Sequence, residues 1–227
     1  MILANKLLGG SLQYSPVLAY QGSAAFTAGN TVFTYASAPI GTAATNRLVV
    51  VVVAYRCNDF TKILSTVTIG GISAVKQATS GGGDPVSIWS AIVPTGTTAS
   101  VVATFATAVN TGVAISVYTI QGGASSTART WGGITNNSTS DTVGFALTIN
   151  KSDAVIVGAV SDQQASGVTL TNVTEDIEYT PAQLSGGTRG TYAAGSALFT
   201  SAPGALAFNA TFTSISRSAI AIAAFNK

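Results

Sequence analysis

The longest run of leucine and β-branched apolar residues is 48–53, a leucine followed by five valines, in a segment flanked by Arg47 and Arg56. Such an unbroken run predicts a β-strand buried on both faces, because a strand with one exposed face alternates polar and apolar residues. A helix is the competing interpretation, but consecutive valines restrict χ1 in a helix and favour a pleated strand. The run is also far shorter than the about 20 residues that a membrane-spanning helix needs.

Short apolar or alternating segments fill most of the chain beyond residue 26, and turn residues such as Gly70-Gly71 and Pro94-Thr95-Gly96 separate them. No segment sustains the 3.6-residue period of an amphipathic helix. The pattern therefore predicts an all-β protein with little helix beyond residue 10. The expected strands are 31–37, 47–56, 65–69, 73–79, 86–93, 99–105, 113–121, 142–149, 154–161, 167–172, 175–179, 192–200, 205–212 and 218–225.

Residues 1–24 differ from the rest and are expected to form an N-terminal arm or anchor. Residues 1–8 can make two helical turns that stop at Gly9-Gly10. Residues 12–20 contain Pro16, which limits them to an edge strand or an extended arm. Two interpretations stay open: an arm that docks on a partner, or a strand or lid that closes one end of the same domain. The candidate partner-binding side chains of the arm are Leu3, Leu7, Leu8, Tyr14 and Tyr20.

Four short segments recur in the same order at nearly constant offsets of 105 to 107 residues. The pairs are 48–51 with 154–157, 89–92 with 195–198, 103–105 with 210–212, and 114–117 with 219–222. Chance is the alternative, because strands rich in Ala, Val and Thr resemble one another, but the constant offset favours an internal duplication of residues 31–121 and 142–225. We therefore expect one jelly-roll-like β-sandwich of about 10–14 strands over residues 25–227, with a core shared by both halves, in preference to two small sandwiches.

Charged residues make up only 8% of the 227-residue chain, far below the usual level of about 25%. The net charge is +2 and the ten basic residues form no run, so the chain has no electrostatic footprint for nucleic acid or an acidic membrane. Cys57 is the single cysteine and is expected to be a small hydrophobic residue. No signal peptide is evident, which predicts synthesis in a cytoplasm without membrane insertion.

The chain has no histidine, which removes Ser-His-Asp and Cys-His catalysis and most zinc chemistry. We therefore expect no enzymatic activity and no cofactor. The only cluster of acids is Glu175, Asp176 and Glu178. On a regular strand Asp176 and Glu178 share a face, so they are weak candidates for a Ca²⁺ site or an acid/base pair. The alternative, which we favour, is a solvated edge strand whose charges oppose aggregation.

Two tryptophans are the candidates for stacking on a sugar. Trp89 lies in the apolar segment 86–93 and is expected in the core. Trp131 is followed by Gly132-Gly133 and is expected in a loop, which makes it the better candidate for an exposed glycan contact.

Several phrases of the chain resemble a family of β-sandwich structural proteins of tailed-bacteriophage virions. They are residues 47–51, 67–74, 92–99 and 115–118, and the resemblance spans roughly residues 30–225. Members of this family look like capsid decoration proteins, head fibres or tail-associated modules. The shared motifs are strand cores and turns, so no functional residue is carried over.

The resemblance implies a non-enzymatic structural protein on the virion surface. Our first hypothesis is a capsid-bound decoration protein, oligomeric and anchored through residues 1–24 to the major capsid protein or another virion protein. The alternative is a tail or head-fibre module that binds a carbohydrate on the host surface. Copy number per virion distinguishes the two hypotheses.

Overall fold

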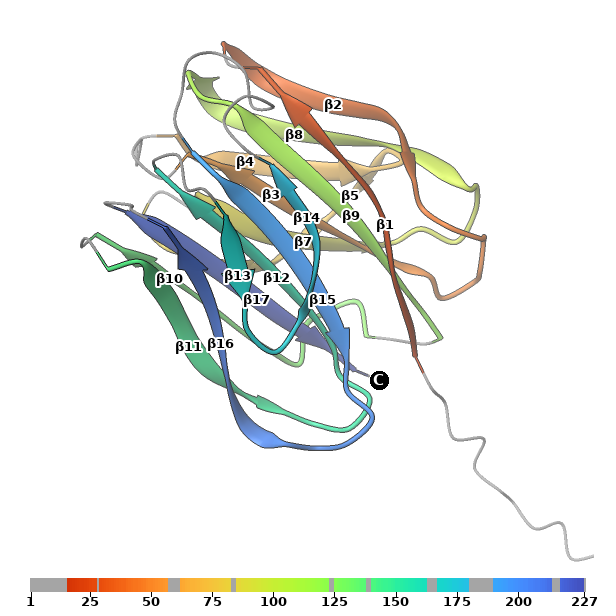
Figure 1. Ribbon diagram of the computed structural model, residues 1–227. Helices are drawn as coiled ribbons and strands as arrows, with labels where there is room; N and C mark the ends of the chain where they lie inside the picture. Colours follow the sequence, from red (N-terminus) through yellow and green to blue (C-terminus); the bar gives the residue numbers. More distant parts are fainter. Residues whose placement is uncertain are drawn as a thin grey trace, which may run out of the picture.

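The computed structural model describes residues 16–27, 29–56, 62–82, 85–122, 125–137, 140–162, 167–179, 190–213 and 217–226. Every regular element in these ranges is a β-strand, so the all-β prediction is confirmed. The described ranges contain seventeen strands, more than the expected ten to fourteen, and these pair in an antiparallel sense in four sheets (Figure 1).

The first half, residues 16–122, forms two of these sheets. The five-stranded sheet has the order β1 (Val17–Phe26), β9 (Val113–Gln121), β3 (Leu48–Tyr55), β7 (Val86–Ile92) and β6 (Val75–Thr79). The four-stranded sheet has the order β2 (Asn30–Pro39), β8 (Thr98–Val109), β4 (Leu64–Ile69) and β5 (Ile72–Ser73). The expected strand 73–79 is divided, because Ile72–Ser73 pairs with β4 across the Gly70-Gly71 turn, whose φ angles are +60° and +80°.

The second half, residues 125–226, forms the other two sheets. Its five-stranded sheet has the order β10 (Thr130–Asn136), β17 (Ser218–Phe225), β12 (Ala154–Ser161), β15 (Tyr192–Leu198) and β14 (Thr174–Tyr179). Its three-stranded sheet has the order β11 (Thr142–Ile149), β16 (Gly204–Phe212) and β13 (Val168–Leu170).

The four sheets stack as layers, with the two five-stranded sheets in the middle (Figure 1). The central core contains buried residues from both halves, which confirms the expected shared core. Each half also has a core of its own between its inner and outer sheet. The described residues therefore form two sandwiches packed face to face through a shared core, where we expected one sandwich.

The valine run explains why the middle layers lie where they do. In β3, Val49, Val51 and Val53 face the outer sheet, whereas Val50 and Val52 face the second half. None of these five side chains is more than 1% exposed. The prediction of a strand buried on both faces is confirmed.

The two halves have the same strand order in their five-stranded sheets, with β1, β9, β3, β7 and β6 matching β10, β17, β12, β15 and β14. The register also matches. Leu48 pairs with Ile92 and Ile120 in the first half, and Ala154 pairs with Leu198 and Phe225 in the second. Below, residues that match in this way are called counterparts.

One domain boundary needs correction. Residues 17–24 were expected in the N-terminal arm, but they belong to β1, which pairs with β9 from Val17 to Phe26. A matching strand precedes the second half, because β10 takes the place of β1 there. Gly132-Gly133 concealed β10 in the sequence, since glycine is unfavourable in strands. Any arm is therefore confined to residues before Pro16.

Candidate functional site

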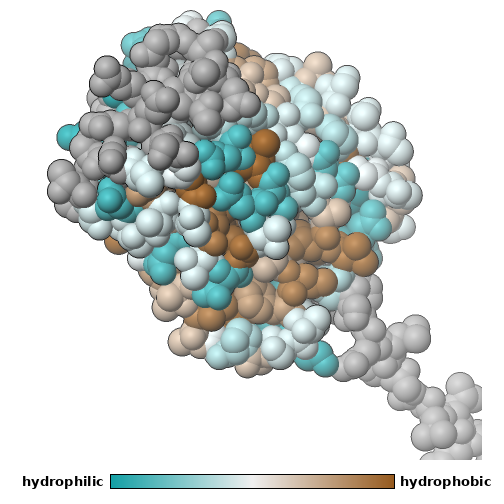
Figure 2. All heavy atoms as spheres, viewed as in Figure 1, coloured by the Kyte–Doolittle hydropathy of each residue, from teal (hydrophilic) through white to brown (hydrophobic). Residues whose placement is uncertain are grey.

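The end of the molecule where β1 begins carries an apolar groove of about 340 Å³, which we call the terminal groove. Its lining residues are Pro16, Lys151, Ser152, Leu198, Phe199 and Thr200. The described chain begins at Pro16 on the wall of this groove, and the C-terminus lies at the same end (Figure 1). Apolar surface gathers beside it (Figure 2), where Val17 is 60% and Leu198 39% exposed.

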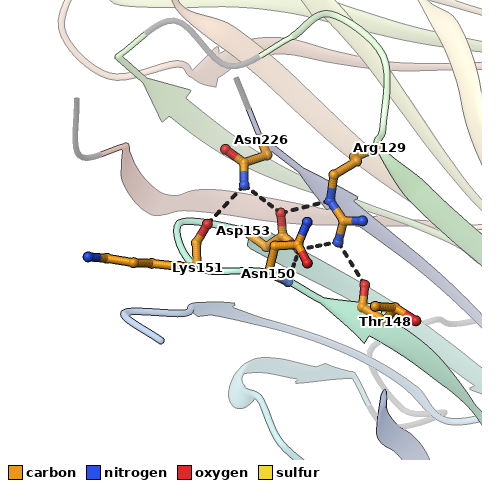
Figure 3. Close-up of polar contacts among 6 residues, drawn as sticks. All are labelled: Arg129, Thr148, Asn150, Lys151, Asp153 and Asn226. Carbon is orange, nitrogen blue, oxygen red and sulfur yellow. Dashed lines mark hydrogen bonds and ion pairs between the residues drawn. The ribbon is translucent and has the colours of Figure 1, made fainter. Parts of the chain in front are cut away.

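A polar network supports one wall of the groove (Figure 3). Its centre is Asp153, which is fully buried directly before β12. Arg129 donates hydrogen bonds from Nε and Nη2 to this carboxylate, the first at 3.1 Å. The amide of Asn226 donates to it at 2.8 Å and the backbone N–H of Asn150 at 2.7 Å. A buried carboxylate needs such compensation, because desolvation strongly disfavours its charge.

The network fixes the turn that carries Lys151 and Ser152. Asn226 also donates to the carbonyl of Lys151 at 3.0 Å, and the N–H of Ser152 donates to the carbonyl of Phe199 at 2.7 Å. Because Arg129, Asn226 and the backbone of Asn150 all donate to the Asp153 carboxylate, we assign this residue a structural role. The network thus holds the inter-half link, the β11–β12 turn and the C-terminus together beside the terminal groove.

The counterpart of Asp153 in the first half is Arg47, which is also fully buried. Its guanidinium donates to four loop carbonyl groups at 2.7–2.9 Å, those of Gly41, Val93, Thr95 and Gly96. The sequence indicated neither cluster, because an isolated charge before an apolar strand is also typical of a simple strand boundary.

The acidic candidates Asp176 and Glu178 lie on opposite faces of β14, contrary to the shared face that regular alternation predicts. A β-bulge between Glu175 and Ile177 makes Asp176 an extra residue in the strand. Asp176 accepts a hydrogen bond of 2.7 Å from Ser196 on the central-core side. Glu178 pairs with Ala193 on the other side and accepts from the N–H of Val168 at 3.2 Å. The shared site that the sequence suggested is therefore not formed by this pair.

Asp176 lies at the rim of the central core, beside tyrosines of the first half. Burial raises the pKa of its carboxyl group above its usual range, and the hydrogen bond from Ser196 and the nearby Tyr118 partly offset that rise. Burial likewise raises the pKa of Tyr118. Desolvation at this position thus disfavours the ionised form of the carboxyl group relative to an exposed aspartate.

Tyr20, one of the expected partner-binding residues, is half-buried within this protein. Its ring lies 5.4 Å from that of Tyr118, and its hydroxyl donates to Ser23 at 2.8 Å. Ser23 in turn bonds the hydroxyl of Tyr179 at 2.7 Å, which joins β1 to β14. The other expected partner-binding residues, Leu3, Leu7, Leu8 and Tyr14, lie outside the described residues, as does Cys57.

The two tryptophans have different environments. Trp89 is 5% exposed in the core, as expected, and its indole N–H donates to Ser87 at 2.9 Å. Trp131 is 58% exposed, but it lies on strand β10 and not in a loop. It is available for contact with another molecule.

Within the described ranges, no group of three or more Cys, Asp or Glu residues is placed to hold a metal ion. Those ranges also include no helix that is long and apolar enough to cross a membrane. In the comparisons with known proteins, no protein-family model matches the chain, and no curated protein matches it significantly.

Proposed function

We propose that this protein is a non-enzymatic virion structural protein of a tailed bacteriophage, specifically a capsid-bound decoration protein. The observation that carries the proposal is the position of the terminal groove. The N-terminal segment enters the fold where Pro16, Leu198 and Phe199 offer apolar surface. One end of the molecule thus combines an apolar segment and an apolar docking surface.

Other features support a role as a rigid structural part. The central strands of the two middle sheets are buried on both faces, and the charge-poor sequence suits close contact with copies of itself or a partner. The absence of histidine from the sequence supports the non-enzymatic assignment. The proposed partners are the major capsid protein or other virion proteins, together with sister copies in a homo-oligomer at the virion surface.

We further propose that the chain arose by duplication of one jelly roll. In the first half, the orders β1-β9-β3-β7 and β2-β8-β4-β5 each place the earliest strand beside the latest one, as two interlocked Greek keys require. The shared register of β3 and β12 with their neighbours supports a common origin.

The test is a chain that begins at Pro16, added to particles that lack the native copy. This deletion leaves β1 intact, so we expect an unchanged melting curve and loss of binding to particles. A chain that begins at Ser23 loses much of β1 and serves as the unfolding control. Full occupancy by the folded chain that begins at Pro16 would rule out the N-terminal segment as the anchor.

A second candidate function is attachment to a host carbohydrate, which the exposed Trp131 favours. Exposed aromatic rings stack on the apolar faces of sugars. A glycan array would test it with the unchanged protein, Trp131→Phe and Trp131→Ala. Binding that survives the phenylalanine change and is lost with alanine supports this function, and a blank array for all three removes it.

A further inference from the structure

The five-stranded sheets of the two halves pack on each other in a reciprocal way. We call the side of each sheet that contributes to the central core its inner face. Strand β3 lies against β12, and β7 lies against β12 as its counterpart β15 lies against β3. At the edges, β6 meets β10 as β14 meets β1. This arrangement has the form of a symmetric dimer interface, in which two copies use the same patch.

The two inner faces differ in side-chain size at matching positions. The first half has the larger residue at Leu48, Val52, Ile88 and Tyr118, whose counterparts are Ala154, Gly158, Ala194 and Ala223. The second half has the larger residue at Tyr192 and Phe225, whose counterparts are Val86 and Ile120. Because protein interiors are close-packed, faces that differ in this way cannot replace one another.

A buried hydrogen bond between the halves depends on the same difference. The hydroxyl of Tyr192 donates to Ser116 at 2.7 Å, and both side chains are fully buried. Their counterparts, Val86 and Ala221, have no hydroxyl group. In the same arrangement, a pair of second halves would set Tyr192 against Ala221. A pair of first halves would set Ser116 against Val86. Each of these pairings leaves a buried hydroxyl group without a partner, which is costly.

The contact between β3 and β12 excludes the same pairings by shape. Val52 lies there against its own counterpart Gly158, and a Cβ atom on this glycine would collide with the valine. Two first halves would bring two valines to this point, and two second halves would bring two glycines. Overpacking and cavities both destabilise a core. Like pairs are therefore disfavoured by shape as well as by unpaired hydroxyl groups.

We propose that the inner faces form a selective association surface. A first half accepts a second half, from its own chain or from another copy, and rejects another first half, and a second half likewise rejects another second half. The residues that set this selectivity are Tyr192 with Ser116 and Val52 with Gly158. Specificity of this kind depends on mismatches in the wrong pairs as well as on contacts in the right one. The inference does not rest on the proposed role in a virion.

The first test uses the full chain with a protease cleavage site inserted between Gly122 and Ser125, cleaved after folding. The cleaved protein is unfolded in urea and refolded by dilution, and native mass spectrometry then measures which halves associate. We expect pairs of a first with a second half in at least tenfold excess over like pairs. Like pairs in statistical proportion would overturn the proposal.

The same measurement on Tyr192→Phe tests the hydrogen bond. This change removes the hydroxyl group that a pair of second halves would leave without an acceptor, so the share of second-half pairs should rise at least threefold. Tyr179→Phe is the matched control, because it removes a hydroxyl group at the half-buried edge of the same interface. An equal share of second-half pairs in both variants would overturn the role of Tyr192.

The second test uses the uncleaved chain and decides the case in which the cleaved halves do not refold. Gly158→Val should lower the midpoint of urea unfolding. Adding Val52→Gly exchanges the two residues between the faces, and it should recover at least a third of the lost midpoint because the valine again faces a glycine. An exchanged variant no more stable than Gly158→Val alone would overturn the proposal.

Discussion

Val52 and Gly158 are counterparts in β3 and β12, and they face each other where the two central strands meet. A Cβ atom on Gly158 would collide with Cγ1 of Val52 and would lie 2.9 Å from Cγ1 of Val86. The valine therefore fills the space that the glycine leaves empty. Two glycines at these positions would leave a void, and two valines would clash. The difference between the halves therefore allows the two inner sheets to pack closely against each other.

We expect Gly158→Ala to destabilise the protein by about 1–3 kcal/mol, because the added methyl group forces the central sheets apart. Urea denaturation of the purified variant measures the change. Gly167→Ala is the matched control, since a Cβ there meets no atom within 4 Å. Adding Val52→Ala to Gly158→Ala should restore part of the lost stability. If the changes in the free energy of unfolding of the two single variants simply add in the double variant, the proposed contact is contradicted.

Arg47→Leu should cost about 3 kcal/mol or more. The change retains apolar volume but leaves four loop carbonyl groups without their donor, and unsatisfied buried groups cost about 1–3 kcal/mol each. The stability of Arg47→Lys should fall between that of the leucine variant and that of the unchanged protein, because an ammonium group has only three donors. Thermal and urea unfolding check the order, and a leucine variant as stable as the unchanged protein would refute this role.

Arg129→Met should cost about 3 kcal/mol, because it leaves the fully buried Asp153 carboxylate without its cation. Adding Asp153→Asn should relieve part of that loss by removing the buried charge. Lys151→Met, which removes an exposed cation from the same turn, should change stability by less than about 0.5 kcal/mol. This assignment would be contradicted if the double variant lost more free energy of unfolding than the Arg129→Met and Asp153→Asn variants lose together.

Asp176 should make the protein more stable in mild acid than at neutral pH. Its folded-state pKa is raised above the ordinary value of 3.8, so its contribution is full below that value and is lost as pH rises through the folded pKa. Tyr20, Tyr118 and Tyr192 lie near it, and burial raises the pKa of each phenol, so these groups stay neutral over this range. Asp176→Asn should stabilise the protein at pH 7 by less than about 1 kcal/mol, because solvent screens a half-exposed carboxyl group.

The measurement is the unfolding midpoint between pH 3 and pH 7 for both proteins. Burial and the nearby Glu178 also raise the pKa of Glu175. Glu175→Gln is therefore the control for any pH dependence of the unfolding midpoint that remains in the Asp176→Asn variant. An asparagine variant with the same pH dependence as the unchanged protein would show that Asp176 does not contribute.

The strands could be predicted where burial alone decides the residue pattern. The valine run needed two apolar neighbours, one on each face, and it has them in the outer sheet and the second half. The strands β1 and β10 were harder to predict, because Pro16 and Gly132-Gly133 oppose local strand preference. The glycines are required by close packing: a Cβ on Gly132 would collide with Phe145, and one on Gly133 with the backbone at Thr79.

The site depended more strongly on tertiary structure. Regular alternation placed Asp176 and Glu178 together, but the bulge in β14 turned them to opposite faces. The environments of Arg47 and Asp153 depend on loops far away in the sequence, such as the carbonyl of Gly96 and the side chain of Asn226. Such distant contacts leave no periodic pattern in the chain.

The sequence by itself determined the all-β class, the central strand and the spacing of the turns, because these follow from local periodicity and side-chain type. The tertiary structure decided that two sandwiches stack through a common core, and that the terminal groove forms between Pro16 and Leu198. The physical reason is that both results depend on contacts between strands more than a hundred residues apart, where complementary shapes such as Val52 and Gly158 select one arrangement.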